Sequence, residues 1–125
     1  MNLIDTSVWI EFFRDPLRAG FLVPLLEEDQ VLLHPWVFGE LLLGGIGSAH
    51  ETLSRDLARL HSAPLVPHDE VLHLIRGRHL TGRGIGWVDA QLLASALIAD
   101  ARLWTFDRKL AAVAGELEVE GLPVQ

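Results

Sequence analysis

The chain has 125 residues, half of them hydrophobic, so it is long enough for one domain with a substantial core. It contains no cysteine, which excludes disulfide bonds, thiolate metal sites and cysteine nucleophiles and fits a reducing cytoplasm. The formal net charge of −7 does not favour nucleic-acid binding, which ordinarily requires clustered lysine and arginine, although bound divalent cations would reverse the local field.

The first part of the chain alternates short apolar runs with amphipathic stretches. Ser7 suits the N-cap of a helix that Asp15-Pro16 ends, and Pro35 suits the first turn of another helix that ends at Gly44. The expected elements are a strand at 2–6, a helix at 8–13, an amphipathic stretch at 17–28, a strand at 31–33 and a helix at 35–43.

The remainder continues the alternation, and its helix over 88–99 is rich in alanine and leucine, which indicates burial. The expected elements are a helix at 48–61, a strand at 65–66, a helix at 69–79, a glycine-rich loop at 81–86, a helix at 88–99, a strand at 102–105, a helix at 108–114 and a last strand at 117–119. Short apolar strands alternating with helices predict a single α/β domain over residues 1–125, with a mostly parallel central sheet of four or five strands flanked by helices.

Membrane insertion and secretion are not expected. Each apolar run is interrupted well short of the ~18 residues needed to cross a bilayer. The opening residues lack the basic region of a secretory signal. We therefore expect a soluble, cytoplasmic protein with no membrane partner.

Four acidic residues occupy positions at which a parallel sheet places ligands. Asp5 stands at the end of the first strand and Asp107 just past the end of the strand at 102–105, so both lie at one edge if those strands are neighbours. Asp89 lies in the first turn of the buried helix that leads into that strand. Glu40 lies among apolar residues that predict burial, and a buried carboxylate needs a cation, hydrogen bonds or a raised pKa.

A cluster of carboxylates is best neutralised by a hard divalent ion that prefers oxygen ligands, Mg²⁺ or Mn²⁺. Each acid also has a purely structural interpretation. Asp5 and Asp107 could cap turns or helices, Asp89 could complement a helix dipole, and Glu40 could be a semi-exposed acid on a helix edge. The metal-site interpretation gains its weight from all four acids taken together.

Three segments surround the acidic residues: Leu3-Ile-Asp-Thr-Ser-Val-Trp-Ile10, Trp87-Val-Asp-Ala-Gln-Leu-Leu-Ala-Ser-Ala96 and Leu103-Trp-Thr-Phe-Asp-Arg-Lys-Leu110, with Glu40 in the helix between the first two. In this order they resemble the PIN-domain ribonucleases, in particular the VapC-type toxins of toxin–antitoxin pairs. The resemblance covers essentially the whole chain and is weaker from residue 117 onward.

The resemblance implies an Mg²⁺- or Mn²⁺-dependent endoribonuclease that acts as a homodimeric toxin with a cognate antitoxin. Asp5, Glu40, Asp89 and Asp107 would be its catalytic and metal-binding acids, with Thr6 or Ser7, and Thr105, as small polar residues beside them. Water activated by the metal would then attack the scissile phosphate of RNA.

Five basic residues near the proposed acids are candidates for holding the RNA backbone, although each could equally belong to a solvated charged face. They are Arg76, Arg78, Arg83, Arg108 and Lys109.

Two other functions compete with this hypothesis. A phosphatase with Asp5 as nucleophile would need a second aspartate two residues later, where this chain has Ser7. A catalytically silent partner-binding domain would suit the apolar, acidic composition, and chelator-sensitive RNA cleavage distinguishes it from the enzyme. The sequence does not specify which RNA is cut.

Overall fold

The computed structural model describes residues 1–44 and 50–121, and it contains a four-stranded parallel sheet. The strand order is β3-β2-β1-β4. The strands are β1 (Asn2–Ile4), β2 (Val31–Leu33), β3 (His61–Ser62) and β4 (Arg102–Trp104). The predicted α/β class, the parallel sheet and its four-strand size are confirmed.

β1 is an interior strand of the sheet, paired with β2 on one side and β4 on the other. Leu3 pairs with Leu32 of β2 on one side and with Leu103 of β4 on the other. Leu3 and Ile4 are completely buried, as expected for a strand covered on both faces. The chain leaves β1 toward β2, whereas β4 adds to the opposite side of β1, so the strand order reverses between β1 and β4. Crevices that bind ligands form at such reversals, beyond the carboxyl ends of the strands.

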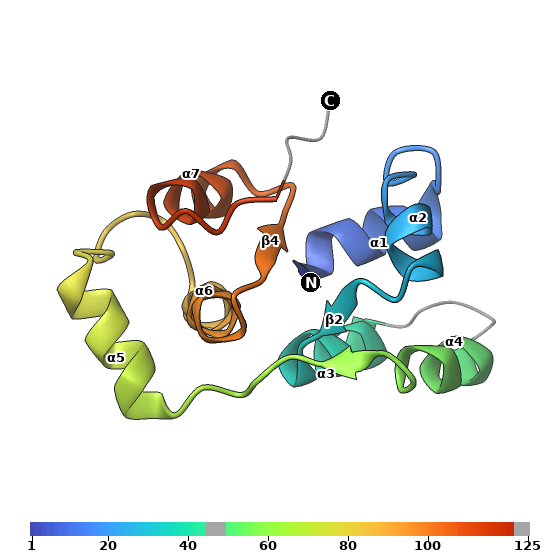
Figure 1. Ribbon diagram of the computed structural model, residues 1–125, viewed down its shortest axis with the longest axis horizontal. Coiled ribbons are helices and arrows are strands. Elements are labelled where there is room, and N and C mark those ends of the chain that lie inside the picture. Colours follow the sequence, from blue (N-terminus) through green and yellow to red (C-terminus); the bar gives the residue numbers. More distant parts are fainter. Residues whose placement is uncertain (45–49, 122–125) are drawn as a thin grey trace.

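Helices cover the sheet in two groups (Figure 1). One side carries α1 with α2, and the other carries α5 with α6. The helices of the described residues are α1 (Thr6–Arg14), α2 (Leu22–Glu27), α3 (Pro35–Gly44), α4 (His50–Leu57), α5 (His68–Gly77), α6 (Trp87–Ala99) and α7 (Arg108–Glu116). Within the described ranges, no helix is long and apolar enough to cross a membrane.

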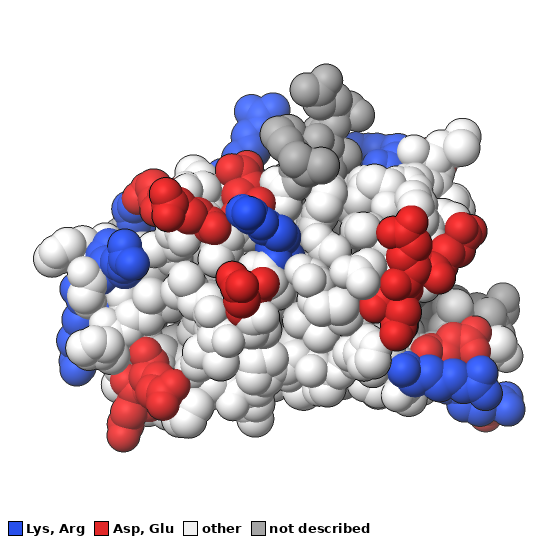
Figure 2. Space-filling model, viewed as in Figure 1, with Lys and Arg blue, Asp and Glu red and all other residues white. Residues whose placement is uncertain are grey.

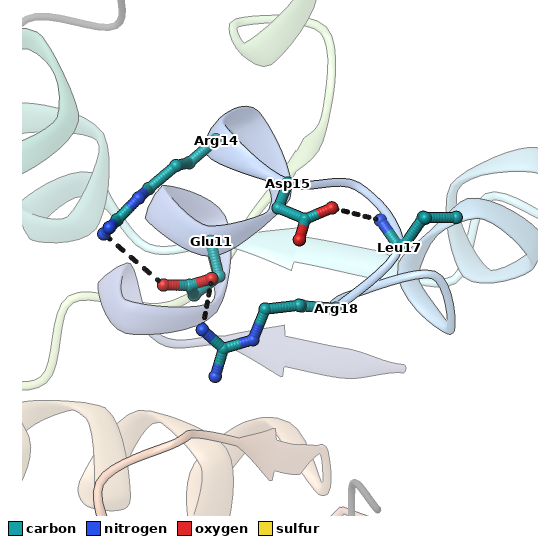
Figure 3. A network of polar contacts seen from close by, with 5 residues as sticks. All are labelled: Glu11, Arg14, Asp15, Leu17 and Arg18. Atoms are coloured by element: carbon teal, nitrogen blue, oxygen red, sulfur yellow. Dashed lines mark hydrogen bonds and ion pairs between the residues drawn. The ribbon is translucent and has the colours of Figure 1, made fainter.

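The end of α1 is held by ion pairs on the surface (Figure 3). The Glu11 carboxylate lies between Arg14, at 3.7 Å, and Arg18, at 3.2 Å. Asp15 then accepts a hydrogen bond from the backbone N–H of Leu17 at 3.3 Å, which tightens the turn after the helix. The predicted amphipathic stretch at 17–28 therefore begins as a turn and is helical only over α2.

The predicted strand at 65–66 is wrong. The third strand lies earlier, at His61–Ser62, and Leu65 is 56% exposed. Val66 is buried, but its N–H and C=O are both hydrogen-bonded by the side-chain amide of Gln91, at 2.7 and 3.1 Å. Those backbone groups are therefore not available to a strand ladder.

Two further boundaries differ from the predictions. The helix predicted at 48–61 is α4, which ends at Leu57, and residues 48 and 49 lie outside the described part of the chain. The strand predicted at 117–119 does not form. Glu118 adopts a left-handed φ of 61°, and up to residue 121, where the described part of the chain ends, this segment joins the sheet through one parallel bridge between Glu120 and Leu103.

A buried histidine links β2 to α6. His34 is fully buried, its Nδ1 accepts from the N–H of Trp36 at 3.0 Å, and its Nε2 lies 3.3 Å from Oε1 of Gln91. Burial lowers the pKa of His34, and hydrogen bonds with Gln91 and Pro64 only partly oppose this effect. The imidazole is therefore neutral in the folded protein at neutral pH.

Candidate active site

Asp5 is the centre of the polar cluster at the carboxyl end of β1. It follows the last residue of the strand and is the N-cap of α1, in place of the predicted cap Ser7. Its Oδ1 accepts from the N–H of Thr6 at 2.8 Å. Its Oδ2 accepts from the hydroxyls of Ser7, at 2.9 Å, and Thr105, at 2.7 Å. These donors hold a carboxylate that is only 8% exposed in a single orientation.

Thr105 joins Asp5 to Asp107. Its hydroxyl donates to Asp5 and accepts from the backbone N–H of Asp107 at 3.0 Å. Asp107 is exposed and caps α7 through a single oxygen, Oδ1, which accepts from the N–H groups of Lys109, at 2.8 Å, and Leu110, at 3.2 Å. The capping interpretation of Asp107 is therefore confirmed, and both capping bonds use the same oxygen, Oδ1.

Glu40 comes from α3, and its expected burial is wrong because the side chain is exposed. The apolar stretch around it is not fully buried either, since Leu43 in the same helix is 91% exposed. The carboxylate is nevertheless tied to the cluster, because the Thr6 hydroxyl donates to its Oε1 at 2.8 Å. Thr6 thus contacts Asp5 with its N–H and Glu40 with its hydroxyl.

Asp89 lies in the first turn of α6, half-buried, and its Oδ2 accepts from the N–H of Gly86 at 2.9 Å. Burial raises the pKa of Asp89 most, the Gly86 bond opposes this, and the negative charges of Asp5, Asp107 and Glu40 raise it further. Hydrogen bonds through Thr6 and Thr105 therefore link Asp5 to Glu40 and to the backbone of Asp107, whereas Asp89 is related to these three acids through their charges.

The donor set fits a hard divalent cation in its chemistry. It consists of carboxylate oxygens whose orientation is set by hydroxyl and backbone donors, as Mg²⁺ and Mn²⁺ sites require. In residues 1–44 and 50–121, no three His, Asp or Glu side chains are close enough to hold one metal ion as they stand. Glu40 and Asp107 are exposed, and a metal site would require their carboxylates to turn toward Asp5 and Asp89.

The predicted basic residues have different surroundings. Arg76 and Arg78 are exposed at the end of α5, and Arg108 and Lys109 are exposed where α7 begins beside Asp107. Arg83 is instead half-buried in a two-pronged ion pair with Glu116. Acidic and basic side chains are interspersed over the face seen in Figure 2, with large uncharged areas between them.

Two elements of the site were missed by reasoning from sequence. The Gly86 N–H bonds Asp89 three residues later, a spacing typical of helix caps that could have revealed it. The Arg83–Glu116 pair joins residues 33 apart in sequence, and no local pattern indicates it.

Comparisons with known proteins agree with this geometry. A family model for the PIN domain matches residues 3–116. Ribonuclease VapC32 from two Mycobacterium tuberculosis strains, CDC 1551 / Oshkosh and ATCC 25618 / H37Rv, is 50% identical over 117 residues, covering 93% of this chain and 92% of the relative. A solved toxin–antitoxin complex from Klebsiella pneumoniae shares the fold, with a TM-score of 0.70 at 20% identity over 92% of this chain and 94% of that chain.

Proposed function

Because this chain belongs to the PIN domain family and is similar to VapC ribonucleases along almost its whole length, we propose that it is a ribonuclease toxin. The finer proposal is that it cleaves RNA phosphodiester bonds endonucleolytically and depends on Mg²⁺ or Mn²⁺. The observation that carries this proposal is the hydrogen-bonded chain that runs from Glu40 through Thr6 to Asp5, and from Asp5 through Thr105 to the backbone of Asp107. The charges of these three acids also raise the pKa of Asp89.

The repulsion among these acids supports a cation as the cofactor. Burial raises the pKa of Asp89 most, the Gly86 bond opposes this, and the charges of Asp5, Asp107 and Glu40 raise the pKa further, so a bound cation would relieve this repulsion. Bound divalent metal would supply an activated water and neutralise charge on the scissile phosphate. The proposed ligands are Asp5, Glu40, Asp89 and Asp107.

The hydroxyl residues have a separate task in this proposal. Thr6 donates its N–H to Asp5 and its hydroxyl to Glu40, and Thr105 donates its hydroxyl to Asp5 while it accepts from the backbone N–H of Asp107. These bonds would orient the carboxylates of Asp5 and Glu40 for a metal. Ser7 adds a third bond by donating to Asp5 and accepting from the N–H of Phe106 at 3.2 Å. Ligand orientation by such neighbours is typically needed for full affinity.

Phosphate binding would fall to the exposed cations. Arg108 and Lys109 stand at the start of α7, directly after Asp107, and Arg76 and Arg78 stand at the end of α5. Arginine and lysine at such positions orient a nucleic-acid backbone without reading its sequence. The acidic net charge is then compensated locally by bound metal rather than by a broad basic surface.

We further propose that the protein works in the cytoplasm as a homodimer and is neutralised by a cognate antitoxin protein. Large apolar side chains are exposed at several places, with Leu17 at 92% and Leu43 at 91%, and such surface is typical of protein contacts. Light scattering of the purified protein tests the dimer, and co-purification with the product of a neighbouring gene tests the antitoxin.

The deciding experiment is RNA cleavage by the purified protein with Mn²⁺, before and after EDTA. Wild type is expected to cleave only with metal, and Asp5→Asn is expected to fold normally but lose about 100-fold or more in rate. Asp56→Asn, which removes the same charge from exposed α4, is the matched control and should cleave normally.

Cleavage by Asp5→Asn at the wild-type rate would rule out the site. If the wild-type protein cleaves neither transfer, ribosomal nor messenger RNA with Mg²⁺ or Mn²⁺, the result supports the alternative function of a partner-binding domain without catalysis.

A further inference from the structure

We propose that Arg83 is a positioning residue for the Asp89 carboxylate, acting through its ion pair with Glu116, and that it does not bind RNA. The effect of Arg83 on catalysis rests on the proposed function, whereas its effect on the position of the loop does not. The segment concerned is the glycine-rich loop, residues 81–86, which leads directly into α6. Its last residue, Gly86, donates the backbone hydrogen bond that Asp89 accepts.

The first contact that holds this loop is a two-pronged ion pair. Nη1 of Arg83 donates to Oε1 of Glu116 at 2.9 Å, and Nη2 donates to Oε2 of the same carboxylate. Such fork-shaped pairing fixes the planes of both groups and is more specific than a single contact. Glu116 is the last residue of α7, so the pair attaches the loop to the end of that helix.

The second contact is made by the loop backbone. Gly84 has a left-handed φ of 81°, and a Cβ at this position would lie only 2.6 Å from Cδ of Lys109. The loop therefore lies directly on the Lys109 side chain, near the beginning of α7, while Arg83 reaches the end of the same helix. Leu80, just before the loop, is buried and anchors its other side.

These two contacts determine where Gly86 stands. Two residues after Gly84, the Gly86 N–H meets Oδ2 of Asp89 at 2.9 Å, and its C=O accepts from the N–H of Ala90 at 3.0 Å. A loop released from α7 would be less restricted, because Gly82 and Gly84 offer little resistance to backbone rotation. Asp89 would then lose the donor that sets its orientation.

The same pair argues against RNA contact by Arg83. Both of its terminal nitrogens are engaged by Glu116. The pair uses two of the five N–H donors of the guanidinium, and a phosphate approaching the remaining donors would meet the negative charge of Glu116.

The experiment compares Arg83→Gln, Glu116→Gln and the charge-reversed double variant Arg83→Glu/Glu116→Arg. In EDTA, amide hydrogen exchange of peptides spanning residues 81–90 is expected to speed up about equally in both single variants and to slow again in the double variant. In cleavage assays with Mn²⁺, both single variants are expected to lose about tenfold in kcat with little change in KM, as when a ligand-orienting neighbour is removed. The double variant is expected to recover most of this loss.

Arg18→Gln is the matched control, because it breaks the ion pair with Glu11, remote in sequence from the loop (Figure 3). It should change neither the exchange of residues 81–90 nor kcat. If Arg83 binds RNA instead, Arg83→Gln raises KM, Glu116→Gln leaves it unchanged or lowers it, and the double variant is the worst of the three. That pattern, or unchanged exchange in both single variants, overturns the proposal. The exchange result in EDTA does not depend on activity, so it remains decisive even if the protein cleaves no RNA.

Discussion

Replacing Asp89 by Asn is expected to abolish RNA cleavage and also to make the metal-free protein more stable. In the folded protein the pKa of Asp89 is raised by burial and by the charges of Asp5, Asp107 and Glu40, against the opposing Gly86 bond. A carboxyl with a raised folded pKa binds more protons folded than unfolded, so its stabilising contribution exists at low pH and is lost as pH rises through that pKa. At neutral pH the ionised side chain of Asp89 therefore lowers the free energy of unfolding, and the neutral amide of Asn does not have this effect.

The size of the effect follows from the exposure of Asp89. The side chain is half-buried, so solvent screens part of the repulsion, and the expected gain is about 1 kcal/mol near pH 7.5. For a domain of this length that corresponds to a Tm increase of roughly 3–5 °C. Asn retains an oxygen that can accept from the Gly86 N–H, so the first turn of α6 stays capped. The stability difference between Asp89→Asn and wild type should become smaller as pH falls, because the wild-type carboxyl then becomes protonated and neutral.

Urea and thermal unfolding followed by circular dichroism, first in EDTA and then with added Mn²⁺, measure both parts of this prediction. Metal at tenfold above its Kd is expected to stabilise wild type by about 1.4 kcal/mol and Asp89→Asn by much less, so the order of stability reverses. Asp56→Asn controls for the change in net charge. The reasoning is refuted if Asp89→Asn is destabilised in EDTA, or if Mn²⁺ stabilises it as much as it stabilises wild type.

Two further predictions concern other contacts. Thr105→Val preserves shape but removes the hydroxyl between Asp5 and Asp107, and it is expected to weaken Mn²⁺ binding or activity by roughly 10–100-fold. Calorimetric Mn²⁺ titration of the two proteins measures this, and an unchanged affinity would show that Thr105 is dispensable. The pKa of His34 is lowered in the folded protein, so below about pH 6.5 the unfolded chain binds a proton at this histidine more readily than the folded protein does. The free energy of unfolding should therefore fall as pH decreases, by up to ~1.4 kcal/mol per pH unit. Urea unfolding between pH 7.5 and 5.5 should show this slope in wild type and a flatter one in His34→Gln, and equal slopes would contradict it.

The alternation of apolar runs and helices was sufficient to predict the class of fold and three of its four strands. Strands such as β1 and β4 are buried on both faces and therefore carry a continuous apolar signal. Asp5 follows β1 and Asp107 lies just past β4, so the general geometry of parallel sheets predicts that they share one edge if the strands are neighbours, and β1 and β4 are paired.

Other features depend on contacts that no local pattern records. His61 and Ser62 are polar and exposed, and they form β3 only because β2 supplies a ladder for them. Val66 has the apolar character of a strand residue, but its backbone is bonded by the side chain of Gln91, 25 positions later. The exposure of Glu40 likewise reflects how α3 lies on the molecule, which the apolar character of its neighbours did not indicate.

The adjacency of β1 and β4 has a consequence for biosynthesis. Asp5 is synthesised early, but its contacts with Thr105 and Asp107 can form only after residues 102–107 have been synthesised. A ribosome that has made only the first hundred residues carries a nascent chain with three of the four acids but without the strand that completes their surroundings. The contacts that complete the proposed site can therefore form only after synthesis has passed Asp107.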